Sequence, residues 1–159
     1  MPLKGGREKK YMSGGDNFFV DSNLLLYQFS PAEIPKQSAA DRWMGHLWSY
    51  GSGRISWQVI HEFYANAVKK LRMPALTARL VVEQLMEWEP DEPDIEMIRR
   101  AWHWCDSAQL NYWDALIVSA AEQSGSQWLL SEDFQNGREF GAITVVNPFL
   151  RQPSEFGLV

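Results

Sequence analysis

Short apolar runs and longer amphipathic segments alternate along the chain from residue 17 onwards. Phe18–Val20 is apolar throughout, as in a strand buried on both faces. Further strand-like runs lie at 54–57, 128–130 and 143–146. Strands that alternate with helices form parallel sheets with helices packed on both faces. The pattern therefore predicts a three-layer α/β/α sandwich with a central parallel sheet of about four or five strands.

Between the strands, apolar residues recur at the three- and four-residue spacing of helices that cover a core. Helices are predicted over 22–29, 37–50, 59–71, 75–88, 94–110 and 112–123. Residues that stop helices follow several of them, such as Pro31, Gly51 and Pro74. The elements from 17 to 150 are therefore expected to form one domain.

The two ends of the chain differ from this domain. Residues 1–16 are polar and rich in Gly and Lys, so we expect them to be a flexible basic arm or residues left over from an expression vector. Residues 151–159 are expected to form a C-terminal tail. No apolar run approaches the roughly 18–20 residues that cross a bilayer, and Cys105 is the only cysteine. These features favour the reducing cytoplasm and no membrane association.

The charge is unfavourable for nonspecific binding of nucleic acid. The formal net charge is −5, and residues 1–16 contribute four basic and two acidic side chains, which leaves about −7 on the remainder. A coat protein for nucleic acid binds through bulk positive charge, which this chain lacks. An enzyme that holds cations in an acidic pocket, and meets phosphate through them, is compatible with the same balance.

Four acids lie where the predicted topology brings them to one end of the sheet. Asp21 directly follows the first strand, and Asp133 follows the strand at 128–130. Glu62 comes soon after the strand at 54–57, and Asp114 opens the helix at 112–123. Ligands of open parallel sheets bind in the crevice beyond the carboxyl ends of the strands. The four acids are therefore the candidate site.

Each acid taken alone also has a structural explanation. Asp21 is well placed to cap the next helix, and Asp114 is favoured near a helix N-terminus by the helix dipole. Glu62 and Asp133 are compatible with ordinary surface positions. Gathered together, however, two carboxylates about 4 Å apart repel by roughly 4 kcal/mol at an effective dielectric constant near 20. One or two Mg²⁺ or Mn²⁺ ions would relieve this repulsion and could activate water against a phosphodiester.

The segments that carry these acids resemble those of PIN-domain nucleases, including the VapC-type toxins. FFVDSNLLLY is similar to the opening strand of that family, and HEFYANAVKKL is similar to its glutamate-bearing helix, with Lys70 near the usual lysine. YWDALIVSAAEQSG resembles the helix with the third acid. WLLSEDFQNG and ITVVNPF resemble the closing strands and the acid loop between them. The resemblance spans about residues 17–149.

The resemblance implies a set of site residues. The acids Asp21, Glu62, Asp114 and Asp133 would be both catalytic and metal-binding. Supporting positions would be Ser22, Asn23, Ser131 and Asn136. Close relatives often carry a further aspartate at the last of these positions, and an asparagine contributes no charge to a second metal site.

The resemblance also implies a function: an endoribonuclease that uses Mg²⁺ or Mn²⁺, one or two ions, and acts as the toxin of a toxin–antitoxin pair. Its partners would be an RNA substrate and an antitoxin protein, with a homodimer as a further possibility. A phosphatase of the haloacid-dehalogenase type is disfavoured, because it requires Asp-x-Asp and Asn23 occupies the second position. A PIN fold kept as a binding adaptor is the other alternative, against which the four intact acids argue.

The helix at 22–29 raises the question of where an antitoxin would bind. Leu24, Leu25, Leu26 and Tyr27 make it apolar on nearly every side, although a single apolar stripe suffices for a core. We therefore expect part of this surface, with Trp48 of the next helix, to form an exposed groove for an amphipathic antitoxin helix. Closure of a core or of a homodimer is the alternative.

Overall fold

The computed structural model describes residues 15–159, so the arm expected over 1–16 lies almost wholly outside the described residues. The elements follow in the order β1 (Phe18–Val20), α1 (Ser22–Tyr27), α2 (Ile34–Tyr50), β2 (Gly53–Arg54), α3 (Trp57–Lys69), α4 (Ala75–Leu85), η1 (Met86–Trp88), α5 (Ile95–Ala108), α6 (Tyr112–Gln123), β3 (Trp128–Leu130), β4 (Glu139–Phe140), β5 (Ile143–Val146) and η2 (Pro153–Phe156). None of the helices in this described part is long and apolar enough to cross a membrane.

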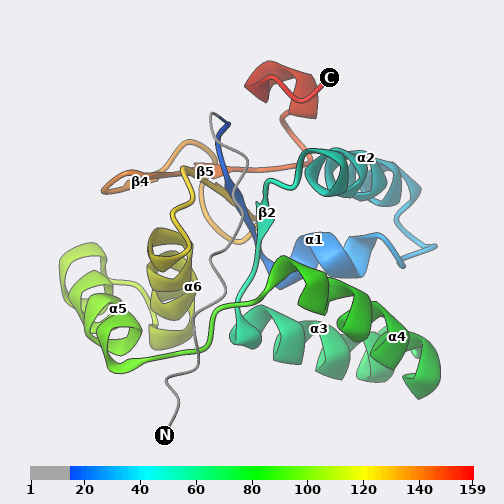
Figure 1. Ribbon diagram of the computed structural model, residues 1–159, viewed down its shortest axis with the longest axis horizontal. Coiled ribbons are helices and arrows are strands. Elements are labelled where there is room, and N and C mark those ends of the chain that lie inside the picture. The colour runs from blue at the N-terminus through cyan, green and yellow to red at the C-terminus, as the bar shows by residue number, and fades with distance from the viewer. Residues whose placement is uncertain (1–14) are drawn as a thin grey trace, which may run out of the picture.

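A five-stranded sheet in the order β2-β1-β3-β5-β4 forms the centre of the fold. β1 pairs in parallel with β2 and β3, and β3 pairs in parallel with β5. Helices α5 and α6 lie on one side of the strands, and α1, α3 and α4 lie on the other (Figure 1). The α/β/α architecture expected from the sequence is confirmed. Only the two-residue strand β4 was not expected, and it is antiparallel to β5 at the edge.

The register of β1 and β3 places the carboxyl ends of both strands side by side. Val20 pairs with Leu130, and the next amide, that of Asp21, donates to the Leu130 carbonyl over 3.0 Å. All three residues of β1 are buried, because helices cover both faces of the sheet. Asp21 and Ser131 therefore leave the sheet as neighbours from a rigid, fully packed pair of strands.

The side chains that the sequence assigned to a groove on the helix at 22–29 divide between the core and the surface. Leu24 and Leu25 are 0% and 1% exposed and belong to the core, while Leu26, Tyr27 and Trp48 are partly buried against it. The indole of Trp48 packs on that of Trp88 with centroids 4.7 Å apart. Leu24 and Leu25 are buried because α1 is only six residues long and is enclosed by its neighbours. Leu26 and Tyr27 line a cavity of about 220 Å³, so a groove for an antitoxin on this helix stays a prediction.

The second strand is shorter than the expected range 54–57. β2 pairs only over Gly53–Arg54, while Ser56 forms a bridge with Asp91 and Trp57 opens α3. Gly53 has a steric reason to lack a side chain, because a Cβ there would lie 2.3 Å from the ring of Trp88. The bridge at Ser56 ties the start of α3 to the segment that precedes α5.

The C-terminal tail expected over 151–159 is packed onto the domain. The ring of Phe156 in η2 packs against the rings of Trp128, Trp43 and Phe18, with distances of 4.9–6.0 Å between ring centroids. Leu158 is buried, and the Trp43 indole donates to the carbonyl of Arg151 at 3.1 Å. The tail thus closes the core beside β1.

Replacement of Phe156 by alanine should therefore lower the free energy of unfolding by about 2 kcal/mol, because a half-buried aromatic ring loses its contacts with three other rings. Leu150→Ala, at a side chain that is 67% exposed, is the matched control and should change stability by less than about 0.5 kcal/mol. Denaturant unfolding measures both. Equal stability of the two variants would show that the tail does not contribute to the core.

Candidate active site

Asp21 is the most buried of the four acids. It is 4% exposed and lies at the junction of β1 and α1, where it caps the helix. Its Oδ1 accepts a hydrogen bond from the amide of Ser22 at 2.8 Å, and its Oδ2 accepts one from the hydroxyl of Ser131 at 2.7 Å. The capping role considered from the sequence is therefore real, but it uses only one of the two carboxylate oxygens.

Burial raises the pKa of Asp21 from 3.8 to about 7. The hydrogen bond from Ser131 lowers this pKa, and the negative charge of Asp133 raises it. The Ser22 amide lowers it by a smaller amount, and the charge of Glu62 raises it by a smaller amount. A carboxylate that merely capped a helix at the surface would be stabilised as an anion. Asp21 instead lies in an environment that disfavours its negative charge and would favour a nearby cation.

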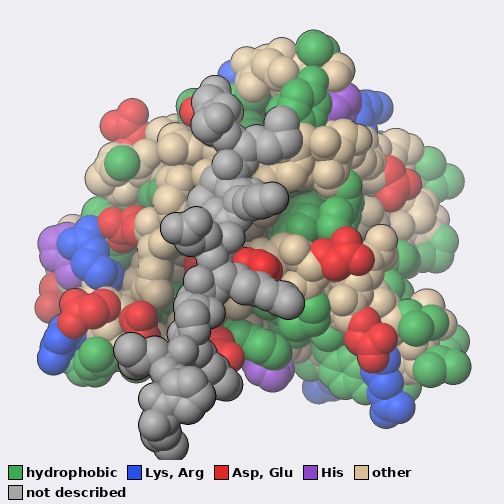
Figure 2. Space-filling view, in the orientation of Figure 1, with side chains coloured by type: hydrophobic (Ala, Val, Ile, Leu, Met, Phe, Trp, Pro, Cys, Tyr) green, Lys and Arg blue, Asp and Glu red, His purple; other side chains and the backbone are tan. Residues whose placement is uncertain are grey.

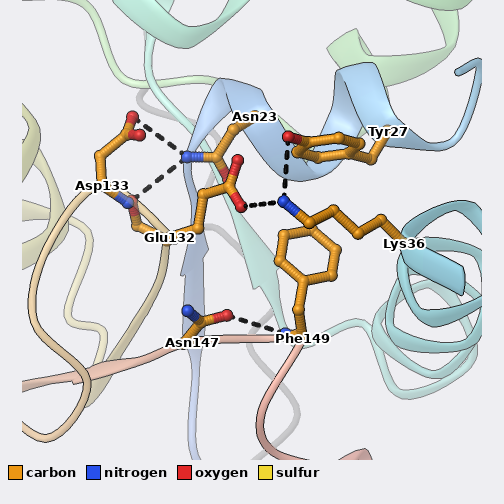
Figure 3. Close-up of polar contacts among 8 residues, drawn as sticks. Asn23, Tyr27, Lys36, Glu132, Asp133, Asn147 and Phe149 are labelled. Carbon is orange, nitrogen blue, oxygen red and sulfur yellow. Dashed lines mark hydrogen bonds and ion pairs between the residues drawn. The ribbon is translucent and has the colours of Figure 1, made fainter. Parts of the chain in front are cut away.

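Asp133 lies on the loop that follows β3 and is tied to α1. Its amide donates to Ser131 Oγ at 3.1 Å, and its Oδ2 accepts from Asn23 Nδ2 at 3.2 Å (Figure 3). Asn23 Nδ2 also lies 3.3 Å from Ser131 Oγ. Ser131 therefore contacts three members of the predicted site, which explains why a small hydroxyl residue suits this position.

Glu62 lies in the second turn of α3 and reaches the same region from another element. Its Oε2 accepts a hydrogen bond from the hydroxyl of Ser22 at 2.8 Å. Its Oε1 accepts one from Gln58 Nε2 at 2.9 Å, and the same Nε2 lies 3.2 Å from the carbonyl of Trp113. Gln58 was not predicted, although its position four residues before Glu62 on a helix is the signal that could have identified it.

Asp114 lies in the first turn of α6, where it forms a reciprocal cap with Asn111. Its amide donates to Asn111 Oδ1 at 3.0 Å, and Asn111 Nδ2 donates to its Oδ2 at 2.8 Å. Burial raises the pKa of Asp114, and the charges of Asp133 and Glu62 raise it further, against the hydrogen bond from Asn111. Asn111 was also missed, although an N-cap residue three positions before an acid is a recognisable pattern.

The four acids thus share one electrostatic environment at the carboxyl end of the sheet. The charges of Asp133 and Glu62 act on both Asp21 and Asp114, although the four come from four separate segments. On the visible part of one face of the molecule, acidic side chains are widespread and Lys and Arg lie mainly at the edges (Figure 2).

The sequence itself matches the model of the PIN domain over residues 18–136. The chain belongs to the PIN-domain family. A solved structure with the same fold is that of VapC20 from Mycobacterium tuberculosis, described as a Sarcin-Ricin loop cleaving toxin. The two share 16% identity with a TM-score of 0.55, over 74% of this chain and 92% of the other. A search of curated proteins gave no match.

The PIN domain presents oxygen donors suited to a hard divalent cation. Asn23 Oδ1 is buried and has no hydrogen-bond partner within residues 15–159, so an acceptor remains available beside Asp133. In the same residues, no three Asp, Glu, His or Cys side chains are gathered closely enough to hold a metal ion as they stand. The carboxylates are instead held by hydroxyl and amide donors. The donor set fits Mg²⁺ or Mn²⁺ in chemistry, and its side chains would have to move for the oxygens to converge on one ion.

Asn136 is positioned differently from the other supporting residues. Its Oδ1 accepts a hydrogen bond from the amide of Asn147 at 2.8 Å, which links the acid loop to the segment after β5. This oxygen therefore stabilises the backbone around the site, and within residues 15–159 Asn136 makes no hydrogen bond to any of the four acids.

A cluster of contacts around Lys36, which the sequence did not reveal, holds the loop that carries Asp133. Lys36 of α2 forms an ion pair with Glu132 at 2.8 Å and donates to the hydroxyl of Tyr27 at 3.2 Å (Figure 3). Its ammonium also lies 4.6 Å and 5.1 Å from the ring centroids of Tyr27 and Phe149. These contacts raise the pKa of Lys36 and keep the amine charged. The cluster fixes Glu132, the neighbour of Asp133, and leaves Lys36 committed to the fold.

Two basic residues of the domain, Arg54 and Arg138, are engaged in contacts within the fold. Arg54 is 7% exposed and donates to the carbonyls of Gly51 and Gly53. Arg138 donates to the Ala108 carbonyl at 3.1 Å and stacks over Phe140. Lys70 is exposed, and it lines a cavity of about 220 Å³ together with Asn23. Of these three residues, Lys70 is the one placed to reach a phosphate near the acids.

The pKa of Asp21 makes a prediction about stability. The folded protein binds the Asp21 proton more tightly than the unfolded chain, since the pKa is about 7 rather than 3.8. Ionisation of Asp21 therefore costs folding free energy that is absent below about pH 4, grows as the pH rises to 7 and is complete above it. With metal removed by chelator, Asp21→Asn should stabilise the protein by about 2 kcal/mol at pH 8, after loss of one hydrogen bond.

At pH 4.5 the same substitution should be neutral or slightly destabilising, because Asp21 is then protonated in the folded wild type. Asp106→Asn, at an exposed position of α5, is the matched control and should not change stability differently at the two pH values. Denaturant unfolding at both pH values gives the comparison. A stability difference for Asp21→Asn that does not depend on pH would contradict the raised pKa.

Proposed function

We propose that this PIN domain is a divalent-metal-dependent endoribonuclease that hydrolyses RNA through metal-activated water, and that it acts as the toxin of a toxin–antitoxin pair. The observation that carries the proposal is the buried Asp21, held by Ser131 and surrounded by the charges of Asp133 and Glu62. A buried carboxylate with a raised pKa and acidic neighbours is costly for the fold, and such sites are commonly functional. The shared fold with VapC20, a toxin described as cleaving the Sarcin-Ricin loop, supports RNA as the substrate class.

In the proposed reaction, Asp21, Glu62, Asp114 and Asp133 hold Mg²⁺ or Mn²⁺. When bound, such an ion would supply an activated water and stabilise the leaving oxygen of the phosphodiester. The hydroxyls of Ser131 and Ser22 orient Asp21 and Glu62 toward the site. Asn23 and Asn111 orient the carboxylates of Asp133 and Asp114 by hydrogen bonds of 3.2 and 2.8 Å. Exposed Lys70 would help to neutralise the substrate backbone. Because water attacks, the products carry a 5′-phosphate and a 3′-hydroxyl.

Asp21→Asn and Asp114→Asn should each reduce cleavage of RNA by more than roughly 100-fold, because each removes a charge that holds the cation. Neither change should unfold the protein, since both residues lie outside the apolar core. Cleavage of labelled RNA by the purified protein, and growth arrest on induced expression in bacteria, are the two measurements. Asp106→Asn is the control. Full activity of both variants would exclude these acids as the active site. A wild-type protein that binds RNA without cutting it would instead favour the alternative of a PIN-fold binding adaptor.

Cleavage should also stop in excess EDTA and return when Mg²⁺ or Mn²⁺ is added, whereas Zn²⁺ alone should not restore it. The reason is the ligand type: carboxylate and amide oxygens favour hard ions, and no cysteine or histidine takes part in the proposed site. End-group analysis of the products completes the test. Undiminished cleavage in chelator with a 2′,3′-cyclic phosphate product would show that the 2′-hydroxyl attacks and no metal is needed.

A further inference from the structure

A cavity of about 730 Å³ adjoins the acids on the side of Glu62, which lines it. Its walls come from the start of α3, the segment 91–93, Met97 of α5 and the start of α6. We propose that this cavity binds an unstacked nucleobase of single-stranded RNA next to the cleaved phosphodiester. The inference rests on the proposed ribonuclease function and names the part of the substrate that the protein would recognise.

The walls offer flat aromatic surfaces to a base. Trp113, which directly precedes Asp114, lines the cavity and is 64% exposed, which is unusual for an indole. On the α3 side, the rings of Trp57 and His61 lie 6.0 Å apart at an angle of 33°. Proteins that bind single-stranded nucleic acid stack bases on aromatic side chains in this way. The position of Trp113 couples such a base to the neighbouring acid.

Two buried polar atoms on the cavity residues need a partner. Ser56 Oγ and Trp57 Nε1 are buried and make no hydrogen bond with any part of the chain that the structure describes. Buried polar groups are normally satisfied, so these two atoms, on residues that line the cavity, would gain a hydrogen bond if a side-chain rotation exposed them to a polar ligand or to water. The indole N–H is a donor and the hydroxyl both donates and accepts. The edge of a nucleobase, with carbonyl or ring-nitrogen acceptors beside N–H donors, complements this pair.

The charge of the lining selects the base rather than the phosphate. Glu92 also lines the cavity, and its carboxylate, which holds no cation in the proposed site, would repel a phosphate that entered it. A nucleobase is neutral, and its amino or imino groups can donate to a carboxylate. The phosphate would therefore remain outside, on the side of Glu62 where the acids and their cations lie. The cavity would thus orient an RNA strand so that one base points into the cavity and the neighbouring phosphate lies at the acids.

Binding of the four uncharged ribonucleosides tests the cavity without metal or phosphate. Titration up to their solubility limits should shift the indole N–H signal of Trp57 in proton–nitrogen spectra, assigned by its loss in Trp57→Phe. Ribose alone should not shift it. Trp113→Ala should weaken nucleoside binding about tenfold, as expected for loss of one stacking surface, and Trp113→Phe should retain most of it. Trp102→Ala removes a similarly exposed indole (53%) outside the cavity and should bind as wild type.

Cleavage of single-stranded RNA gives the second measurement. Trp113→Ala should raise KM about tenfold with kcat little changed, because stacking binds substrate and transition state alike. Phenylalanine should restore most of the affinity. If the nucleosides leave Trp57 unaffected, or if Trp113→Ala binds and cleaves as wild type, the inference is wrong even though the chain is a ribonuclease. A shift of Trp57 by an antitoxin peptide but not by nucleosides would identify a protein-docking surface and overturn it. Nucleoside binding that depends on Trp113, in a protein that cuts no RNA, would keep the cavity and refute the proposed function.

Discussion

The parallel pairing of β1 with β3 is the constraint on which the rest of the site depends. The pairing of Val20 with Leu130 and the bond from the Asp21 amide to the Leu130 carbonyl bring two chain segments, 110 residues apart, to one point. Asp21 then accepts from Ser131 because neither backbone can move without breaking the packed centre of the sheet. Two further acids are attached to this pair through short polar side chains: Glu62 through Ser22, and Asp133 through Ser131 and Asn23. Asp114 is held separately, by Asn111.

This arrangement concentrates negative charge where water is scarce, and the fold must compensate for it. The pKa of Asp21 near 7 means that the metal-free protein holds a carboxylate that resists ionisation at neutral pH. The compensation comes from a large aromatic and aliphatic core that continues into the C-terminal segment, where Phe156 covers Trp43 and Phe18. A cation would remove much of the electrostatic cost. Binding of the proposed metal ion would therefore stabilise the folded protein, and Lys36 holds the loop after β3 through its ion pair with Glu132.

The sequence was most informative where its periodicity and its chemistry agreed. The strand before Asp21 and the helix at Asp114 were predictable because apolar patterns and acids at element ends are local features. Burial on α1 was not, since whether Leu25 faces solvent depends on how α2 and α3 enclose a six-residue helix. The sequence offered helix capping and a place in the acidic site as alternatives for Asp21, whereas the structure shows that it caps α1 and is also a buried acid. The cavity beside Glu62 could not be predicted at all, because the bridge between Ser56 and Asp91 that closes one wall joins segments without any pairing signal in the sequence.

The net charge of −5 limits how this PIN domain can bind RNA. Affinity from neutralised phosphates requires free cations, but Lys36, Arg54 and Arg138 all make contacts within the fold. In the proposed ribonuclease, attraction would then come from bound metal ions, from exposed Lys70 and from contacts with bases, which carry no charge. Metal ions at the acids would hold one phosphate, and stacking beside Trp113 would hold its neighbour, so recognition is concentrated on a few nucleotides around the cut. As the proposed ribonuclease, this protein would discriminate between RNAs by whether a base can leave its stack at the cleavage site, which would favour loops and single strands over continuous duplex.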